Sequence, residues 1–220
     1  MADLSHFQDI KLYGPRLSFR NTSLEDVRNF TATNSDPRAM QHLPMMLKQW
    51  KEEEIAQQIT SRVEEQKLGK AIGLTIETKD FDRQFVGKTG FRQIDIGAKI
   101  GEWGLILDPN HHGKGYAYEA MAVVIGFAFE KLGLKQVIII TAEGNLPMRT
   151  ACSSVGIKES NLKEVIEALG TVPEEVTTAG GTETLQFQLE GQVLYAVSST
   201  EWPAVQEQLK KKIEKRLAFQ

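Results

Sequence analysis

The chain has 220 residues, of which 41% are hydrophobic and 25% are charged, and this composition excludes collagenous, mucin-like and fully disordered proteins. Its 26 Lys and Arg residues nearly balance its 29 Asp and Glu residues. The net charge of −3 therefore predicts no general attraction to nucleic acid or to an anionic membrane. A chain of this length fits one core, so we expect a single domain over residues 1–220.

The sequence also carries features that indicate where the protein resides. Cys152 is the one cysteine, so no intramolecular disulfide can form. The first ten residues contain charged side chains and lack the apolar run of a signal peptide. The longest apolar stretch, Ala120–Phe129, is too short to cross a bilayer. Together these features predict a cytoplasmic protein that has no contact with the membrane.

The first third of the chain predicts one strand and two helices. Arg16–Arg20 alternates polar and apolar residues, which is typical of a strand, and Leu24–Phe30 follows as an amphipathic helix. An irregular segment over residues 34–49 precedes a charged helix that begins near Trp50. Apolar residues recur along one face of that helix at Ile55, Ile59 and Val63.

The middle of the chain predicts an antiparallel meander followed by a βαβ unit. The meander strands are Ala71–Thr78, Phe85–Ile94 and Ile100–Leu107. A helix over about 116–132, a strand over 136–142 and a helix over about 147–155 follow. A strand, a crossover helix and a second strand make a right-handed parallel unit in nearly all proteins.

The last third predicts a surface insertion, two strands and a terminal helix. Residues 158–183 are rich in Gly and Pro around a short helical pattern at 161–169, which favours an insertion on the surface. Strands are expected at Leu185–Leu189 and Val193–Ser198, and a helix at 204–217. The expected fold is a mixed α/β domain with a central, mostly antiparallel sheet of six to seven strands, flanked by helices.

The glycine-bearing loop after the third meander strand is the strongest functional motif. A strand ending at Leu107 leads into a loop with Gly113 and Gly115, and a helix begins directly afterwards. Glycines allow backbone N–H groups to approach an anion, and the positive end of the helix dipole favours a negative charge there. The motif therefore predicts a phosphate or pyrophosphate site.

Two other phosphate-binding motifs are alternative interpretations of the glycines in this part of the sequence. A P-loop is excluded, because the position of its first glycine is Asp82 and a strand follows Thr89. A dinucleotide fold would use Glu143, at the end of the next strand, for a ribose. Against it, Tyr118 occupies the third glycine position and five residues separate the strand from Gly113. The dinucleotide hypothesis stays open at this point.

The loop resembles motif A of the GNAT family of N-acetyltransferases, and in particular the ribosomal-protein alanine acetyltransferase (RimJ- and RimL-like) branch. The matching residues are His112-Gly113-Lys114-Gly115-Tyr116-Ala117, with His112 in place of the usual Gln or Arg. The likeness also includes Asp108-Pro109, the segment 11–30, Asn145 and Gly156-Ile157. It covers roughly residues 11–157 and the last two strands.

The resemblance implies a fold and a co-substrate. It implies a sheet that is splayed between the strands 100–107 and 136–142, with acetyl-CoA lying in the opening. Backbone groups of Leu105, Ile106 and Leu107 are expected to bind the pantetheine arm, and Asn145 to lie near the thioester. The pyrophosphate is expected on the loop residues His112, Gly113, Lys114, Gly115, Tyr116 and Ala117.

The resemblance also implies direct transfer of the acetyl group to a primary amine, on a small molecule or a protein N-terminus. Such a transfer needs a base for the amine, and Glu102 matches the family's position for one. The family's two usual acid positions hold Met148, which has no proton to give, and Cys152. Cys152 is either the general acid or a buried apolar residue. A non-catalytic acyl-CoA-binding module and an NAD-dependent oxidoreductase remain as alternative functions.

The acceptor side is expected in the segment between the first two helices. In relatives this segment lines the acceptor pocket, which points to His42, Met45 and Trp50 here. His111 and His112 have no further ligands at zinc spacing, so no metal site is predicted. The resemblance leaves the acceptor, and the choice between monomer and homodimer, undetermined.

Overall fold

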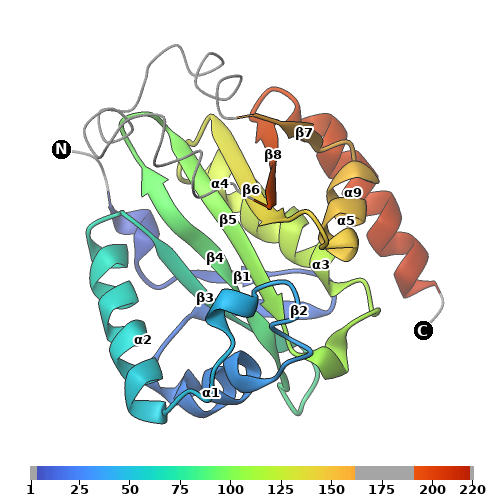
Figure 1. Ribbon diagram of the computed structural model, residues 1–220. Helices are drawn as coiled ribbons and strands as arrows, with labels where there is room; N and C mark the ends of the chain where they lie inside the picture. Colours follow the sequence, from blue (N-terminus) through green and yellow to red (C-terminus); the bar gives the residue numbers. More distant parts are fainter. Residues whose placement is uncertain (1–3, 162–190, 219–220) are drawn as a thin grey trace.

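The computed structural model describes residues 4–161 and 191–218, and in them the chain forms one eight-stranded sheet (Figure 1). The strand order is β1-β2-β3-β4-β5-β6-β8-β7. All neighbouring strands are antiparallel except β5 and β6, which are parallel. The strands are β1 (Lys11–Tyr13), β2 (Leu17–Asn21), β3 (Ile72–Thr78), β4 (Phe85–Asp95), β5 (Ile100–Leu107), β6 (Gln136–Ala142), β7 (Lys158–Ser160) and β8 (Gln192–Ser198).

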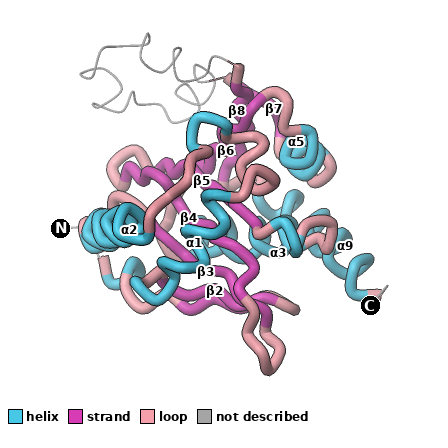
Figure 2. Tube along the Cα trace, turned by 60° about the horizontal axis from the view of Figure 1, so that its bottom comes forward, coloured by secondary structure: helices cyan, strands magenta, loops and turns pink. Residues whose placement is uncertain are grey.

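Helices cover both faces of the sheet (Figures 1 and 2). On one face lie α1 (Val27–Ser35) and α2 (Glu52–Lys67). On the other lies a continuous helical rod made of α3 (Tyr116–Ala120), the π-turn η5 (Met121–Ile125) and α4 (Gly126–Glu130), with α9 (Trp202–Leu217) packed against it. The helix α5 (Leu146–Ser153) follows β6. Short 3-10 turns are η1 (Ser5–Phe7), η2 (Leu24–Asp26), η3 (Pro44–Met46) and η4 (Pro109–His111).

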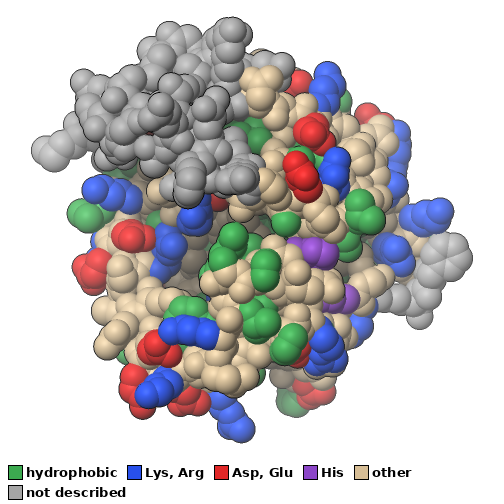
Figure 3. All heavy atoms as spheres, viewed as in Figure 1, with side chains coloured by type: hydrophobic (Ala, Val, Ile, Leu, Met, Phe, Trp, Pro, Cys, Tyr) green, Lys and Arg blue, Asp and Glu red, His purple; other side chains and the backbone are tan. Residues whose placement is uncertain are grey.

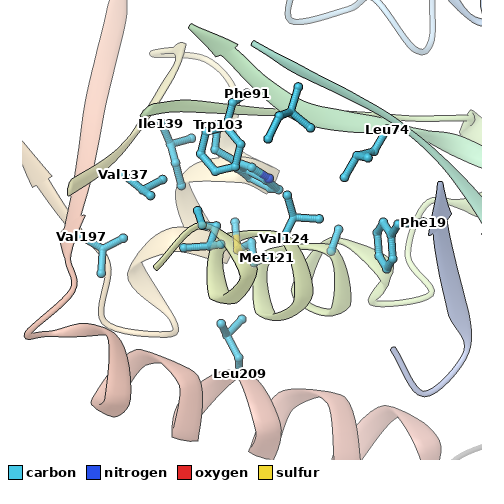
Figure 4. Close-up of a cluster of buried hydrophobic side chains, with 14 of the residues drawn as sticks. Phe19, Leu74, Phe91, Trp103, Met121, Val124, Val137, Ile139, Val197 and Leu209 are labelled. Carbon is cyan, nitrogen blue, oxygen red and sulfur yellow. The ribbon is translucent and has the colours of Figure 1, made fainter. Parts of the chain in front are cut away.

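The main core lies between the sheet and the helical rod (Figure 4). Trp103 and Phe91 project from neighbouring central strands toward Met121 in η5, and all three are almost completely buried. Leu209 of α9 closes the rod from its other side. The rod is apolar nearly all round because it contacts the sheet on one side and α9 on the other.

A second apolar cluster holds α1 and α2 to the opposite face. Phe30, Ile55 and Ile59 are buried together, and Phe85 of β4 packs against them. The apolar face of α2 is therefore buried against the sheet, which agrees with the face that the four-residue spacing predicts. None of the helices in residues 4–161 and 191–218 is long and apolar enough to cross a membrane.

The predicted fold class is confirmed, with differences at the edges of the sheet. Eight strands form where six to seven were expected, because β1 and β7 have three residues each and such short runs give no clear alternation. Residues 158–160, expected to begin an insertion, instead pair with β8 as the edge strand β7. The helix at 161–169, the strand at 185–189 and the rest of the insertion lie outside the described residues.

Candidate active site

The two parallel strands of the sheet separate after a short contact. β5 and β6 pair only from Ile100↔Gln136 to Glu102↔Ile138. Beyond that point β5 stays paired with β4 to Leu107, and β6 stays paired with β8 to Ala142. The facing edges of residues 103–107 and 139–142 are therefore open, and the sheet has a splay.

The open edge of β5 presents the backbone of two of the three predicted residues. Asp108 N–H donates to the Val86 carbonyl at 2.9 Å, so Leu107 and its partner on β4 form a non-hydrogen-bonded pair. By the alternation of an antiparallel ladder, the N–H and C=O groups of Leu105 and Leu107 point toward the splay. Those of Ile106 point toward β4, which differs from the expectation for this residue.

A compact loop follows at the end of β5. Asp108 accepts a hydrogen bond from Asn110 N–H at 2.8 Å and caps η4. His112 Nε2 lies 3.1 Å from the Leu107 carbonyl oxygen and ties the loop back to the strand. His111 is buried, and burial together with nearby Lys114 lowers its pKa, so its Nδ1 can accept from Lys114 Nζ at 3.3 Å.

The loop ends in a cradle of unpaired donors at the start of the helical rod. Gly113 and Gly115 have φ values of +75° and +78°, in the left-handed region that favours glycine. Among the described residues, no acceptor is found for the backbone N–H groups of residues 113–117. Donors that converge on a helix N-terminus bind anions, so the predicted pyrophosphate residues form a suitable site.

A buried ion pair fixes this cradle to the sheet. Glu119 in α3 is fully buried, and its carboxylate accepts from the backbone N–H of Arg16 at 2.6 Å and of Leu17 at 2.8 Å. It also accepts from Arg16 Nε at 3.0 Å. A second nitrogen of the guanidinium, Nη1, donates to the Lys114 carbonyl at 3.0 Å. The sequence predicts no such role for Arg16, although a carboxylate within an apolar helix indicates a buried partner.

Helix α9 also reaches the cradle. A Cβ placed on Gly115 would lie 2.9 Å from Cγ of Arg216 and 3.5 Å from its Nε. The helix expected at 204–217 has no part in the site that the sequence predicts. The structure places its exposed Arg216 guanidinium beside the glycine loop.

Glu102 lies where the splay begins. Its side chain is 15% exposed, and both carboxylate oxygens accept from Arg92, from Nε and Nη2, each at 2.9 Å. Gly101 and Trp103 face the helical rod. By strand alternation Glu102 therefore faces the α1–α2 side. The predicted base thus lies at the point where the pairing of β5 with β6 ends and the open edge of β5 begins.

Asn145 caps the helix that follows β6. Its Oδ1 accepts from Met148 N–H at 3.2 Å, and its Nδ2 donates to Thr141 Oγ1 at 2.8 Å. The side chain is thereby held at the end of β6, across the splay from β5. Asn145 therefore lies at the rim of the splay, and its hydrogen bonds also stabilise the start of α5.

The two candidate acid positions lie in or against the core. Cys152 is fully buried, and burial raises the pKa of its thiol to about 12. Met148 packs against the same core cluster. This environment favours the apolar packing role for Cys152 that the sequence had left open beside the acid role.

The predicted acceptor residues lie in the α1–α2 loop. Figure 3 shows hydrophobic side chains gathered over this loop beside a hollow in the surface. Met45 is 76% exposed, whereas Trp50 is half-buried and its Nε1 donates to the Met46 carbonyl at 3.1 Å. His42 is half-buried in the same segment. Trp50 also packs against the α1–α2 cluster, so it supports the loop.

The cavities and the metal-ligating side chains of the described residues do not indicate a second site. Cavities of about 590 Å³, between α9 and η5, and about 290 Å³, beside Gln66, contain none of the predicted site residues. No cluster of three metal-ligating side chains occurs in residues 4–161 and 191–218. The single parallel pair is incompatible with the doubly wound parallel sheet of a dinucleotide fold, so that hypothesis is wrong.

Comparison with known proteins agrees with this geometry. The chain is 29% identical over 161 residues to the N-acetyltransferase p20 of Bacillus licheniformis, an alignment of 72% of this chain and 89% of that one. Its fold is similar to RimJ of Mycobacterium smegmatis, crystallised with CoA-disulfide, with a TM-score of 0.67, 17% identity and coverage of 93% and 95%. A ribosomal-protein-serine acetyltransferase structure from Vibrio cholerae gives a TM-score of 0.63 at 17% identity, with coverage of 86% and 98%.

The family model of the acetyltransferase (GNAT) domain matches residues 16–158. This range contains the splay, the glycine loop, Glu102 and Asn145. Because the match includes more than half of the sequence, the chain belongs to the GNAT family of acetyltransferases, which use acetyl-CoA.

Proposed function

We propose that the splay between β5 and β6 binds acetyl-CoA, and that the acetyl group passes directly to a primary amine held on the α1–α2 side. The observation that carries this proposal is two nearby sets of backbone groups without partners among the described residues. One set is the N–H groups of residues 113–117, and the other is the edge of β5 beyond its last pair with β6, Glu102↔Ile138.

The residues present fit the co-substrate in shape and charge. The cradle offers several N–H donors and a helix N-terminus to the pyrophosphate. From Leu107 to Trp103 the open edge runs for about 13 Å at roughly 3.3 Å per residue. An extended arm bonded to the backbone of Leu107 and Leu105 would end where β6 closes the edge. The reactive end then lies beside Gly104 and Glu102.

The chain's own residues support direct transfer. Acetyl-CoA supplies an activated acetyl thioester. An amine must lose a proton to attack it, and the Glu102 carboxylate faces the side where the amine would enter. Arg92 binds both oxygens and fixes their position, and each oxygen retains a lone pair for a proton delivered directly or through one water.

Release of the thiol does not require a dedicated acid. A thiol has an ordinary pKa near 8.5, so its thiolate is a competent leaving group that takes a proton from solvent. The burial of Cys152 and the apolar side chain of Met148 agree with this route.

Replacing Gly113 by Asp tests the cradle. A Cβ at Gly113 meets no atom within 4 Å, whereas one at Gly115 meets Arg216, so residue 113 is the cleaner position for an added charge. A carboxylate there repels the pyrophosphate, and we expect acetyl-CoA affinity to fall by about 30- to 100-fold, or roughly 2–3 kcal/mol. Isothermal titration calorimetry with acetyl-CoA measures the loss.

The matched control is Gly113→Asn, which has the same shape without the charge. Asn tolerates the left-handed conformation, so we expect it to lose at most a few-fold in affinity. Equal losses in the two variants would mean that backbone strain, and not an anion in the cradle, sets the effect. Unchanged affinity in Gly113→Asp would place the co-substrate elsewhere.

A further inference from the structure

On the α1–α2 side of the sheet, β5 has an open space over Gly104, which we call the hollow. Glu102, Gly104 and Ile106 of β5 face this side, and in register Gly104 is opposite Gly90 and Ile106 is opposite Lys88. Gly90 is buried, whereas Gly104 has no side chain to fill the space above the sheet. Gly104 is exposed although β5 is a central strand, and a Cβ on it would meet no atom within 4 Å.

At one end of this hollow lies a cation without an anionic partner. Lys88 is half-buried; its Nζ donates to Asn34 Oδ1 at 2.7 Å and lies 4.8 Å from the Phe30 ring centre. Among the described residues no carboxylate is within ion-pair distance of Nζ. Burial, and to a smaller extent the charge of Arg62, lower the pKa of Lys88 to about 8.

The amide that binds Lys88 lacks an acceptor as well. Asn34 Nδ2 is buried and has no hydrogen-bond partner among the described residues. Polar groups buried in this way nearly always have partners in folded proteins. Lys88 Nζ and Asn34 Nδ2 therefore place more donors than acceptors at this point, and an oxygen anion would supply the missing acceptor.

The carboxylates around the hollow are already neutralised. Glu102 is paired with Arg92, Asp26 with Arg20, and Glu77 with Arg20 and Arg83. This face therefore offers no free carboxylate from these residues to a polycationic acceptor, whereas Lys88 offers a free cation to an anionic one. The charge pattern of the hollow selects for an acceptor that bears a negative group.

The positions of Gly104 and Lys88 set the distance between the amine and the negative group of the acceptor. On the proposed function, the reacting amine lies near Gly104, beside the base. Lys88 of β4 is opposite Ile106, so it is the diagonal cross-strand neighbour of Gly104, at a distance of about 7–8 Å. A flexible lysine side chain shortens that span, so a few bonds between amine and anion suffice.

We propose that the acceptor is an amino-acid-like amine, with a carboxylate a few bonds from its primary amine, and that Lys88 binds this carboxylate in the hollow over Gly104. Lys88 is then a specificity-determining residue on the acceptor side. The inference rests on the proposed transfer of an acetyl group at the splay.

Matched acceptor pairs test the inference. CoA release is followed with 4-aminobutyrate against butylamine, β-alanine against propylamine, and an acidic peptide against its amidated form, with spermidine as a cationic acceptor. We expect kcat/KM to be at least tenfold higher for the carboxylate-bearing member of at least one pair. Lys88→Met should abolish that preference mainly through KM, and Lys88→Arg should retain most of it.

Lys70→Met is the charge-matched control, because Lys70 is exposed in the turn after α2. It should keep the wild-type preference, and all variants should bind acetyl-CoA within about twofold of wild type. Transfer to uncharged amines or to spermidine without preference for carboxylates would overturn this inference alone, as would an unchanged preference in a folded Lys88→Met. Intact acetyl-CoA binding without transfer to any acceptor would overturn both this inference and the proposed function.

Discussion

Replacing Glu102 by Gln is expected to lower kcat by about 100- to 1,000-fold while acetyl-CoA affinity stays within about twofold of wild type. Gln keeps the size of the side chain and one acceptor for Arg92, but it cannot take a proton from the amine. The carboxylate is 15% exposed where the open edge of β5 begins, which is where the proposed function places the amine. Steady-state kinetics at saturating acetyl-CoA measure the loss.

The size of this loss should depend on the acceptor. An amine that is already neutral at the assay pH needs less help from a base, so the ratio of wild-type to variant kcat should shrink for acceptors of low amine pKa. Glu64→Gln, an exposed change of the same charge on α2, serves as the control and should leave kcat unchanged. A kcat within threefold of wild type for every acceptor would exclude Glu102 as the base.

Replacing Glu119 by Ala is expected to lower the free energy of unfolding by about 3–5 kcal/mol. The carboxylate is fully buried and accepts from two backbone N–H groups and from the guanidinium of Arg16. Its removal leaves the Arg16 charge and these N–H groups buried without a partner. Chemical denaturation followed by tryptophan fluorescence measures the change.

A double variant separates the loss of the ion pair from the cost of leaving one charge buried without a partner. Arg16→Met alone should also destabilise strongly, since it leaves Glu119 buried without its cation. The combination of Arg16→Met with Glu119→Met should be more stable than the sum of the two single changes predicts. Glu130→Ala, at the end of the same rod, should cost less than about 1 kcal/mol. Additive losses in the double variant would show that the two side chains are not coupled.

The same pair connects stability to function. Arg16 Nη1 bonds to the Lys114 carbonyl, so the ion pair fixes the backbone between the two cradle glycines. A folded Arg16→Met protein should therefore bind acetyl-CoA more weakly than wild type, because the donors of residues 113–117 lose their fixed arrangement.

The elements with a strong local pattern were predictable from the sequence. The buried face of α2, the central strands and the glycine loop before α3 each follow from periodicity or from turn residues within about 15 positions. The family resemblance then indicated the splay and Glu102. The structure confirms the fold, and the roles of the individual site residues stay predictions.

The remaining features depend on contacts between distant parts of the chain. Arg16 and Glu119 are 103 residues apart, and Arg216 reaches Gly115 from the other end of the sequence. Lys88 looks like an ordinary polar strand residue until Asn34 of α1 and Ile106 of β5 are brought beside it. Local propensity carries no information about such pairs, because tertiary packing decides them.

Hydrogen–deuterium exchange of the full chain with saturating acetyl-CoA tests whether the co-substrate lies on the glycine loop and the open edge of β5. We expect slower exchange of the amides of residues 113–117 and of Leu105 and Leu107, with little change along the exposed face of α2 and no comparable effect from NADH. Saturation with acetyl-CoA that leaves residues 113–117 unprotected, or that protects the groove between α9 and η5 instead, would contradict it.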